Sequence, residues 1–306
     1  MKTRGFLLPI LALLAAAACV PATGRAQGLD EKDPGIGLNL SVAVIEQAGT
    51  DVGDSEMDLS GYLVQVEKNL VQNRRLILGF SASYGMWNYT FAGPPADTWN
   101  GPWGKVRSVG GGLAIIAPGS GKWSYFLAPV LDCFWEEGAD AADGLVSGAV
   151  AAAVHSFRHD RRLGLGAGVF KGLEDTMVFP FISVSWQLNE DLALQNPLSA
   201  GPAGPAGLEL VYDPSGTWQI GGGWAYTSFR FRLDDEGVGP DGVGEISGIN
   251  VWVRASWQVD PKVKLGAYAG ASLAGDAVIE DSNGRELESE HVGPTPLAAV
   301  TMEWKF

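Results

Sequence analysis

Histidine is the residue type in this chain best suited to acid-base or metal chemistry, and it occurs three times, as His155, His159 and His291. None is spaced from another His or from a Cys as zinc ligands are. His155 precedes Ser156, but neighbouring residues of a strand point to opposite faces, so these two cannot form a nucleophile and base pair within one strand. We therefore predict no catalytic residue, no metal site and no cofactor. We interpret His155 as a polar lining residue that faces inward together with Ser147.

Two runs of glycine, residues 110–112 and 221–223, could be mistaken for phosphate-binding loops. Each lies within an alternating apolar pattern and no helix follows it, so the geometry of a P-loop or dinucleotide fingerprint is missing. Glycine inside such a strand allows curvature or close packing instead. The acidic runs elsewhere lack the ligand spacing of a calcium loop, and we interpret them as solvated. Attraction of cations, or of divalent ions beside lipopolysaccharide, is the alternative.

The first 26 residues have the organisation of a secretory signal. Lys2 and Arg4 precede an apolar segment, residues 6–20, and small residues, Gly24 and Ala26, occupy the positions expected at a cleavage site. We predict a signal peptide over residues 1–26. An alternative is a lipoprotein whose first residue is Cys19, although the Leu expected three positions earlier is missing. Without Cys19, Cys133 is the single thiol, so no intramolecular disulfide is expected.

Charge and composition exclude several classes of protein. The signal holds three basic residues and no acidic one, so residues 27–306 keep 18 basic against 35 acidic residues, a net charge of −17. An acidic exported chain is a poor partner for nucleic acid. With 42 Gly, 2 Cys and 46% hydrophobic residues, a collagen-like chain, a disulfide scaffold and a disordered chain are also poor fits.

Apolar side chains recur at every second position along the chain. The longest uncharged run, residues 76–96, alternates in this way and is interrupted by Gly and Pro, so it is not a membrane helix. In residues 249–258 the odd-numbered positions are apolar, whereas the even-numbered ones include Asn250, Arg254 and Gln258. Repeats of this kind, about ten residues long, are typical of transmembrane β-strands.

The connections between these repeats alternate in length, as in outer-membrane barrels. Short turns rich in Pro, Gly, Asn or Asp alternate with longer acidic or Gly/Pro-rich loops, which we place at residues 48–57, 93–104, 138–143, 197–205, 234–243 and 280–293. The repeats number fourteen, or twelve without a doubtful hairpin at residues 191–213. We predict an all-β fold, a transmembrane antiparallel up-and-down β-barrel of about 12–14 strands, over residues 27–306.

Charged and aromatic residues agree with this topology. Basic residues gather at the short turns and acidic residues in or beside the long loops, so the outer mouth is predicted to be acidic. Aromatic residues fall near strand ends, as interface girdles require. We place Trp87, Tyr89, Trp99, Trp103 and Trp135 toward the loops, and Trp123, Trp186, Tyr212, Trp218, Trp257 and Trp304 toward the turns.

The polar faces of the strands predict the lining of the barrel. Both signs of charge occur among the predicted pore-lining residues, which are Gln65, Glu67, Asp132, His155, Gln187, Glu209, Arg230, Arg232, Asn250, Arg254, Gln258 and Glu303. Such a lining can hold water and pass small polar solutes, or it can close as pairs of Arg with Glu across the lumen. Barrels of eight strands fill their own interior and those of sixteen to eighteen leave a channel, so 12–14 strands leave both outcomes open. The loops at 93–104 and 280–293 are long enough to fold inward.

The last residues carry a more specific resemblance. Phe306 shares a strand face with Val300, Met302 and Trp304, which resembles the C-terminal insertion signal of bacterial outer-membrane barrels. This resemblance implies the bacterial outer membrane as location, with outer-membrane lipid, lipopolysaccharide and the barrel-assembly machinery as partners. A narrower resemblance, to a family of bacterial outer-membrane barrels of unknown function, rests on residues 180–186, 191–197, 207–212 and 229–233 and implies no catalytic residues.

These observations favour a porin-like channel or transporter for small solutes, and not an enzyme. One alternative is a closed structural or adhesive barrel that acts through its loops. Another is a lipid-modifying outer-membrane enzyme built around His155. A soluble periplasmic β-sandwich is the remaining alternative, and it would need no terminal aromatic residue.

Overall fold

The computed structural model describes residues 37–306 except 74, 95–98, 100 and 199–200. The described residues form strands, and no helix among them is long and apolar enough to cross a membrane. The predicted signal peptide lies outside the described residues. The strands are β1 (Leu38–Val52), β2 (Ser55–Gln72), β3 (Ile77–Ala92), β4 (Lys105–Pro118), β5 (Trp123–Glu136), β6 (Leu145–Arg158), β7 (Arg161–Gly172), β8 (Asp175–Gln187), β9 (Leu192–Gln195), β10 (Gly207–Tyr212), β11 (Trp218–Arg232), β12 (Val243–Gln258), β13 (Val263–Glu280), β14 (Glu286–Val292) and β15 (Thr295–Lys305).

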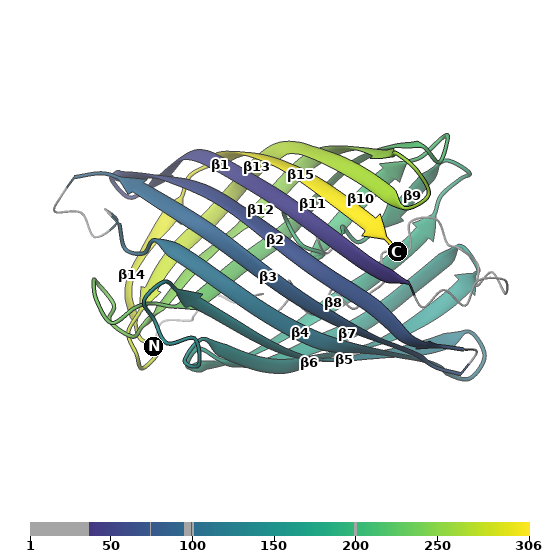
Figure 1. The fold of residues 1–306 in the computed structure, drawn as a ribbon, viewed down its shortest axis with the longest axis horizontal. Helices are drawn as coiled ribbons and strands as arrows, with labels where there is room; N and C mark the ends of the chain where they lie inside the picture. Colours follow the sequence, from purple (N-terminus) through teal and green to yellow (C-terminus); the bar gives the residue numbers. More distant parts are fainter. Residues whose placement is uncertain (1–36, 74, 95–98, 100, 199–200) are drawn as a thin grey trace, which may run out of the picture.

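The sheet closes on itself into an antiparallel barrel (Figure 1). Strands β1 to β13 pair in chain order, β13 pairs with β15, and β15 pairs with β1. Strands β14 and β15 lie end to end between β13 and β1 and pair with both, so together they occupy one position in the wall. The wall therefore has 14 strands, which confirms the larger of the two predicted numbers. The doubtful hairpin is present as β9 and β10.

The alternation of side chains along each strand decides which residues face outward and which face into the barrel. Val251 and Val253 of β12 face outward, as do their β11 partners Trp224 and Gly222, because directly paired residues share a face of the sheet. Asn250 and its neighbours on the other face point into the barrel and are buried. An apolar outer face is what a lipid environment requires, and on this part of β12 the inner face is polar.

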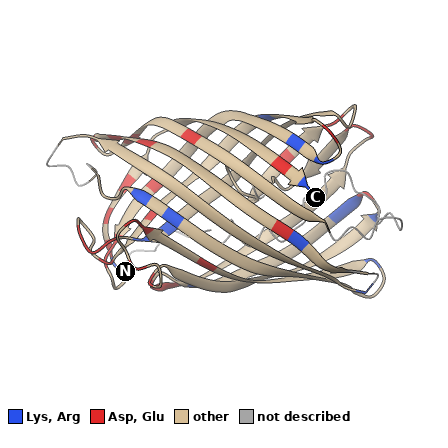
Figure 2. Ribbon diagram, in the orientation of Figure 1, with Lys and Arg blue, Asp and Glu red and all other residues tan. Residues whose placement is uncertain are grey.

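The two ends of the barrel differ. Strand β1 begins and β15 ends at one end, here called the turn end. The opposite end, here called the loop end, holds residues 93–94, 99, 101–104, 137–144 and 233–242. Asp and Glu residues are more frequent toward the loop end, on the left of Figure 2, as the sequence predicts.

Two segments predicted as loops are instead strand hairpins. Residues 48–57 continue β1 and β2 and turn at Gly53, whose φ of 60° is left-handed. Residues 280–293 form β14 and a tight turn at Asp281, whose carboxylate accepts the backbone N–H groups of Asn283 and Arg285. These hydrogen bonds lower the pKa of Asp281. The strands here extend beyond the apolar band, so both faces are polar and the alternation that marks a strand is lost.

Aromatic rings at the turn end lie on the outer face. Trp218 and Trp257 stack across β11 and β12 with ring centroids 5.6 Å apart, and Trp304 stacks on Phe306 at 4.8 Å. Val300 is exposed on the same face of β15 as Trp304. At the loop end the prediction of an outer girdle is wrong for Trp87, Tyr89, Trp99 and Trp103, which are buried inside the barrel.

Candidate functional site

The lumen of the barrel is the candidate functional site. The strand register places Gln65, Glu67 and Glu303 on one inner patch around β1, because Ser41 lies opposite both Gln65 and Glu303. Gln65 Nε2 donates to Glu67 Oε1 at 3.0 Å. Lys264 of β13 lies opposite Glu303 and adds a basic group to this patch that the sequence analysis did not include.

Four more predicted lining residues, Asp132, Glu209, Asn250 and Arg254, also face inward and are buried. Asp132 lies far from the others along the wall, opposite Gly110 of β4 and Val146 of β6. The predicted residues Gln187 and Gln258 lie at the rim of the turn end, where each side-chain amide donates to backbone carbonyls of the adjacent turn, those of Asn189 and Glu190 for Gln187 and of Asp260 and Val263 for Gln258.

His155 does not line the lumen, contrary to the prediction. It is paired with Trp123 across β5 and β6, and Trp123 is exposed on the outer face. The imidazole packs against the rings of Trp123 and Phe157, with centroids 4.8 and 4.6 Å away. Ser156 is the residue of this pair that faces inward, opposite Arg162. The Ala-rich β6 has no strong contrast between its faces, so its sequence does not reveal which face is inside.

Arg230 and Arg232 also depart from the prediction. Both lie on the face of β11 opposite to Phe229 and Phe231, near the loop end, and they do not pair with Glu67 or Glu303. Arg230 donates to Glu245 at 3.2 Å, to Glu280 at 2.6 Å and to the carbonyl of Leu173 at 3.2 Å. Arg232 donates to Glu174 at 2.7 Å and to the carbonyls of Asp143 and Asp241. These two residues therefore join loop-end segments.

One Arg and Glu pair does close across the inner face, as the sequence analysis considered. Arg254 Nε and Nη2 each donate to one oxygen of Glu209 at 2.8 Å, and both side chains are 1% exposed. Trp252 Nε1 donates to the same carboxylate at 3.4 Å, and Ser256 Oγ accepts from Arg254 Nη1 at 2.7 Å. A two-point pair of this kind holds both charges in a fixed geometry.

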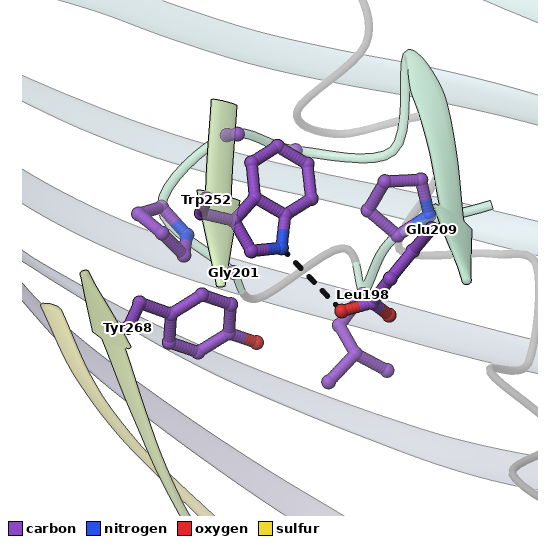
Figure 3. A pocket seen from close by; sticks show the side chains of 9 residues that line it. Leu198, Gly201, Glu209, Trp252 and Tyr268 are labelled. Atoms are coloured by element: carbon purple, nitrogen blue, oxygen red, sulfur yellow. Dashed lines mark hydrogen bonds between the residues drawn. The ribbon is translucent and has the colours of Figure 1, made fainter. Parts of the chain in front are cut away.

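Described residues of the β9–β10 loop, which are 196–198 and 201–206, lie in the lumen beside this pair. Ala203 of this loop belongs to one buried apolar cluster with Ile45 of β1 and Tyr268 of β13, which lie on other parts of the wall. Figure 3 shows Leu198 and Gly201 of the loop close to Glu209, Trp252 and Tyr268. The recess between them has no room for a water-sized sphere, so the loop packs tightly against this part of the wall.

A second obstruction lies at the mouth of the loop end. Trp99 and Trp103 come from the β3–β4 loop and point inward, with ring centroids 5.9 Å apart. Trp103 contacts Tyr89 of β3 and Phe231 of β11 edge to face. Trp99 lies beside Gly53, where a Cβ would come within 3.2 Å of the indole ring. Trp99 and Trp103 thus lie in the mouth between the β1–β2 turn and β11, in line with the expectation that this loop is long enough to fold inward.

The sequence analysis missed this aromatic interior. Trp87 packs against Phe229 with the two rings tilted and their centroids 4.6 Å apart, and Phe134 packs edge to face on the same Phe229 ring at 5.4 Å. A signal was present, since Trp87 lies between Gly61 and Gly85, and a Cβ at Gly61 would meet the indole at 2.7 Å. Large rings that alternate with small cross-strand residues indicate an inner face as well as an interface girdle.

Comparisons with known proteins bear on the fold. No family model and no curated protein sequence matches this chain, so the narrower family resemblance stays a hypothesis. Among solved structures, an outer membrane channel from Pseudomonas putida F1 has a TM-score of 0.50, with 11% identity over 90% of this chain and 99% of that one. A FadL homologue from Pseudomonas aeruginosa has a TM-score of 0.46, with 11% identity over 88% and 89% of the two chains. The chain therefore has the fold of outer-membrane barrels.

Metal-ligating side chains do not gather within the described part of the chain, where no group of three His, Cys, Asp or Glu could hold an ion. The lumen instead presents different chemical environments one after another along the barrel axis. An aromatic mouth leads to the inserted loop with its buried ion pair, and then to polar groups toward the turn end.

Proposed function

We propose that this protein is a bacterial outer-membrane channel for small solutes, which pass through the lumen without chemical change. The observation that carries the proposal is that described residues of two connecting loops obstruct the lumen, namely Trp99 and Trp103 of the β3–β4 loop and Ala203 of the β9–β10 loop. Side chains of the wall alone fill a narrow eight-stranded barrel, but a wall of 14 strands is wide enough to admit loops. Loops can move without opening the hydrogen-bonded wall, so such obstructions suit a restricted channel.

In this function the lining sorts solutes by their chemistry. A solute entering from the loop end first meets the rings of Trp99, Trp103 and Phe231, which favour an apolar or aromatic surface. Farther along, Glu209 and Arg254 neutralise each other and leave no free charge at the inserted loop. We also propose outer-membrane lipid and lipopolysaccharide as the surroundings and the barrel-assembly machinery as the partner that reads the strand ending in Phe306.

A second candidate function is a closed barrel that acts through its loop-end hairpins. The observation that favours it is the length of β13 and β14, which extend at the loop end and carry Glu286, Glu288 and Glu290 (Figures 1 and 2). These hairpins would bind a partner at the cell surface while the lumen stays shut. A lipid-modifying enzyme built around His155 is not proposed, because its imidazole packs between two outer-face aromatic rings.

Single-channel conductance of residues 27–306, refolded into planar bilayers, tests the first proposal. In one variant the β9–β10 loop is shortened by replacing residues 198–204 with a Gly-Ser linker, and in the control the β13–β14 turn, residues 281–285, is shortened instead. We expect discrete steps in the unmodified protein and larger steps in the loop variant alone. A folded barrel without steps in any of the three would contradict the channel and favour the second candidate.

A further inference from the structure

A row of four rings lies on the outer face of β5 to β8 at the turn end of the barrel, to the right in Figure 1. Trp123 of β5 contacts His155 of β6 with ring centroids 4.8 Å apart. His155 in turn contacts Phe157 at 4.6 Å, and Phe157 contacts Trp186 of β8 at 5.5 Å. We call Trp123, His155, Phe157 and Trp186 the ring row. Aromatic rings near strand ends lie where hydrocarbon meets the lipid head groups.

His155 is the most polar member of the ring row. Its strand partners on the outer face are Trp123 and Leu163, and among the described residues no hydrogen bond reaches its ring nitrogens. A neutral imidazole carries one N–H donor and one acceptor nitrogen. A polar group without a partner is costly next to hydrocarbon. The ring row therefore holds a donor and an acceptor that water or a lipid head group must satisfy.

Two arginines face each other beside the ring row. Arg158 of β6 and Arg161 of β7 are directly paired, so both lie on the outer face at the β6–β7 turn. Like charges directly opposite each other destabilise a sheet. No carboxylate of the described residues forms an ion pair with either arginine, and Asp160 in the same turn lies 4.0 Å from His159 instead. An anion bound between the two guanidinium groups would relieve this repulsion.

Two cations at this site are held in place by hydrogen bonds to the backbone. Arg161 Nε donates to the carbonyl of Gln187 at 3.1 Å, and its guanidinium carbon lies 5.7 Å from the centroid of the Trp186 ring. Lys122 Nζ donates to the carbonyl of Phe157 at 3.2 Å. These bonds leave the terminal N–H groups of Arg161 and further N–H groups of Lys122 for another acceptor. With Arg158, three cations border the ring row.

Another pair of rings at the turn end has different surroundings. Trp218 and Trp257 stack on the outer face of β11 and β12 at 5.6 Å. The turns beside them carry two acidic residues, Asp213 and Asp260, and one basic residue, Lys262. A general aromatic girdle therefore does not account for the positive charge beside the ring row, which belongs to the turns that join β4 to β5 and β6 to β7.

We propose that the ring row and its three cations bind the head group of an anionic phospholipid. Its phosphate lies between Arg158 and Arg161, because guanidinium groups match phosphate oxygens with paired N–H donors, and His155 donates to a further oxygen. The acyl chains then lie along Leu163 and Leu165, which are 38% and 67% exposed on the outer face. This inference goes beyond the proposed function, since it concerns the outer face and holds whether or not the lumen conducts.

Photolabelling in vesicles tests the site. Residues 27–306 are refolded into phosphatidylcholine vesicles with a trace of photoreactive lipid, either phosphatidylglycerol or phosphatidylcholine, that carries a diazirine in one acyl chain. Labelled residues are then mapped by mass spectrometry. The measured quantity is the ratio of phosphatidylglycerol to phosphatidylcholine labelling at Leu163 and Leu165. The same ratio at Ile220 and Val253, which are 61% and 63% exposed on the outer face above Trp218 and Trp257, is the internal control.

We expect the ratio beside the ring row to exceed the control ratio by at least about fivefold, since each basic group near an anionic lipid contributes roughly that factor. Arg158→Gln/Arg161→Gln should abolish the difference, and Arg158→Lys/Arg161→Lys should retain part of it. His155→Phe keeps the ring but removes the donor, so it should lower the ratio less. Lys262→Gln/Lys305→Gln removes two adjacent charges at the same end and should leave the ratio unchanged. Heat-modifiable mobility shows that each variant is folded.

Equal ratios beside the ring row and at the control positions would overturn the site. So would an equal loss in the arginine and lysine double variants, because the preference would then follow the net charge of the turn end. Excess inorganic phosphate is the last control. If it removed the preference, the arginines would bind a free anion and the assignment to a phospholipid would be wrong.

Discussion

Removing the carboxylate of Glu209 should strongly destabilise the barrel. In Glu209→Leu, Arg254 keeps one neutral acceptor, the hydroxyl of Ser256, and the ring of Tyr268 at 5.9 Å. Loss of one partner of a buried pair costs about 3–5 kcal/mol, because the other charge is left without compensation. The remaining contacts with Ser256 and the Tyr268 ring offset part of this cost, so we expect a loss at the lower end, roughly 3 kcal/mol.

The control for this variant is a pair of the same length at the surface. Lys105 and Glu137 are 2.7 Å apart with side chains 35% and 46% exposed, so solvent screens the pair and Glu137→Gln should leave the stability nearly unchanged. The double variant Glu209→Leu/Arg254→Met should recover most of the loss, since it removes both buried charges together.

Denaturant unfolding of barrels refolded into lipid vesicles, followed by tryptophan fluorescence and by heat-modifiable gel mobility, measures these differences. A loss below about 1 kcal/mol in Glu209→Leu would refute the reasoning. That result would mean that water reaches Arg254 and screens it, which requires the inserted loop to leave the lumen for much of the time.

Three further predictions concern the mouth, the wall and the loop-end charges. Trp103→Ala removes the central ring of the aromatic mouth, so it should lower the free energy of unfolding by about 3–5 kcal/mol and increase the size of the single-channel conductance steps. Unchanged steps would show that Trp103 does not obstruct the path. Gly207→Ala should prevent formation of the heat-modifiable barrel, since the methyl group would overlap the carbonyl oxygen of Trp224, and normal folding would contradict the close β10–β11 approach. The hydrogen bond from Lys105 lowers the pKa of Glu137, so this pair stabilises the fold above the ordinary carboxyl pKa and ceases to do so as the pH falls through the lowered pKa. Lys105→Met should therefore raise the titration midpoint of the Glu137 carboxyl carbon, measured by NMR. An unchanged midpoint would exclude Lys105 as the cause of the lowered pKa.

The fold could be predicted from sequence because strand periodicity is local. Where the contrast between faces is strong, as at Asn250 and Arg254 against Val251 and Val253, alternation also predicted which side chains lie inside. A transmembrane barrel exposes one apolar face to lipid, so this contrast is a direct consequence of its surroundings.

Predictions were wrong where local contrast is weak or a distant contact decides. His155 lies on a strand rich in alanine, and its face follows from its pairing with Trp123. Trp87 points inward because Phe229, far away in the sequence, completes its packing. Arg230 is polar but points away from the lumen, because the β7–β8 turn covers the outer face of β11 at this position. Each of these outcomes depends on contacts between distant strands, which alternation does not encode.

The inserted loop ties the lumen and the wall together. If residues 196–206 extended β9 and β10 along the wall, they would leave the lumen and cover the free edge of β8 at the same time. Replacing Pro197, Pro202 and Pro205 with Thr favours that extension, because threonine supplies the missing N–H groups and suits a strand. Such a variant should therefore show larger conductance steps than the unmodified protein. Unchanged steps in a folded variant would mean that this loop does not obstruct the path through the lumen.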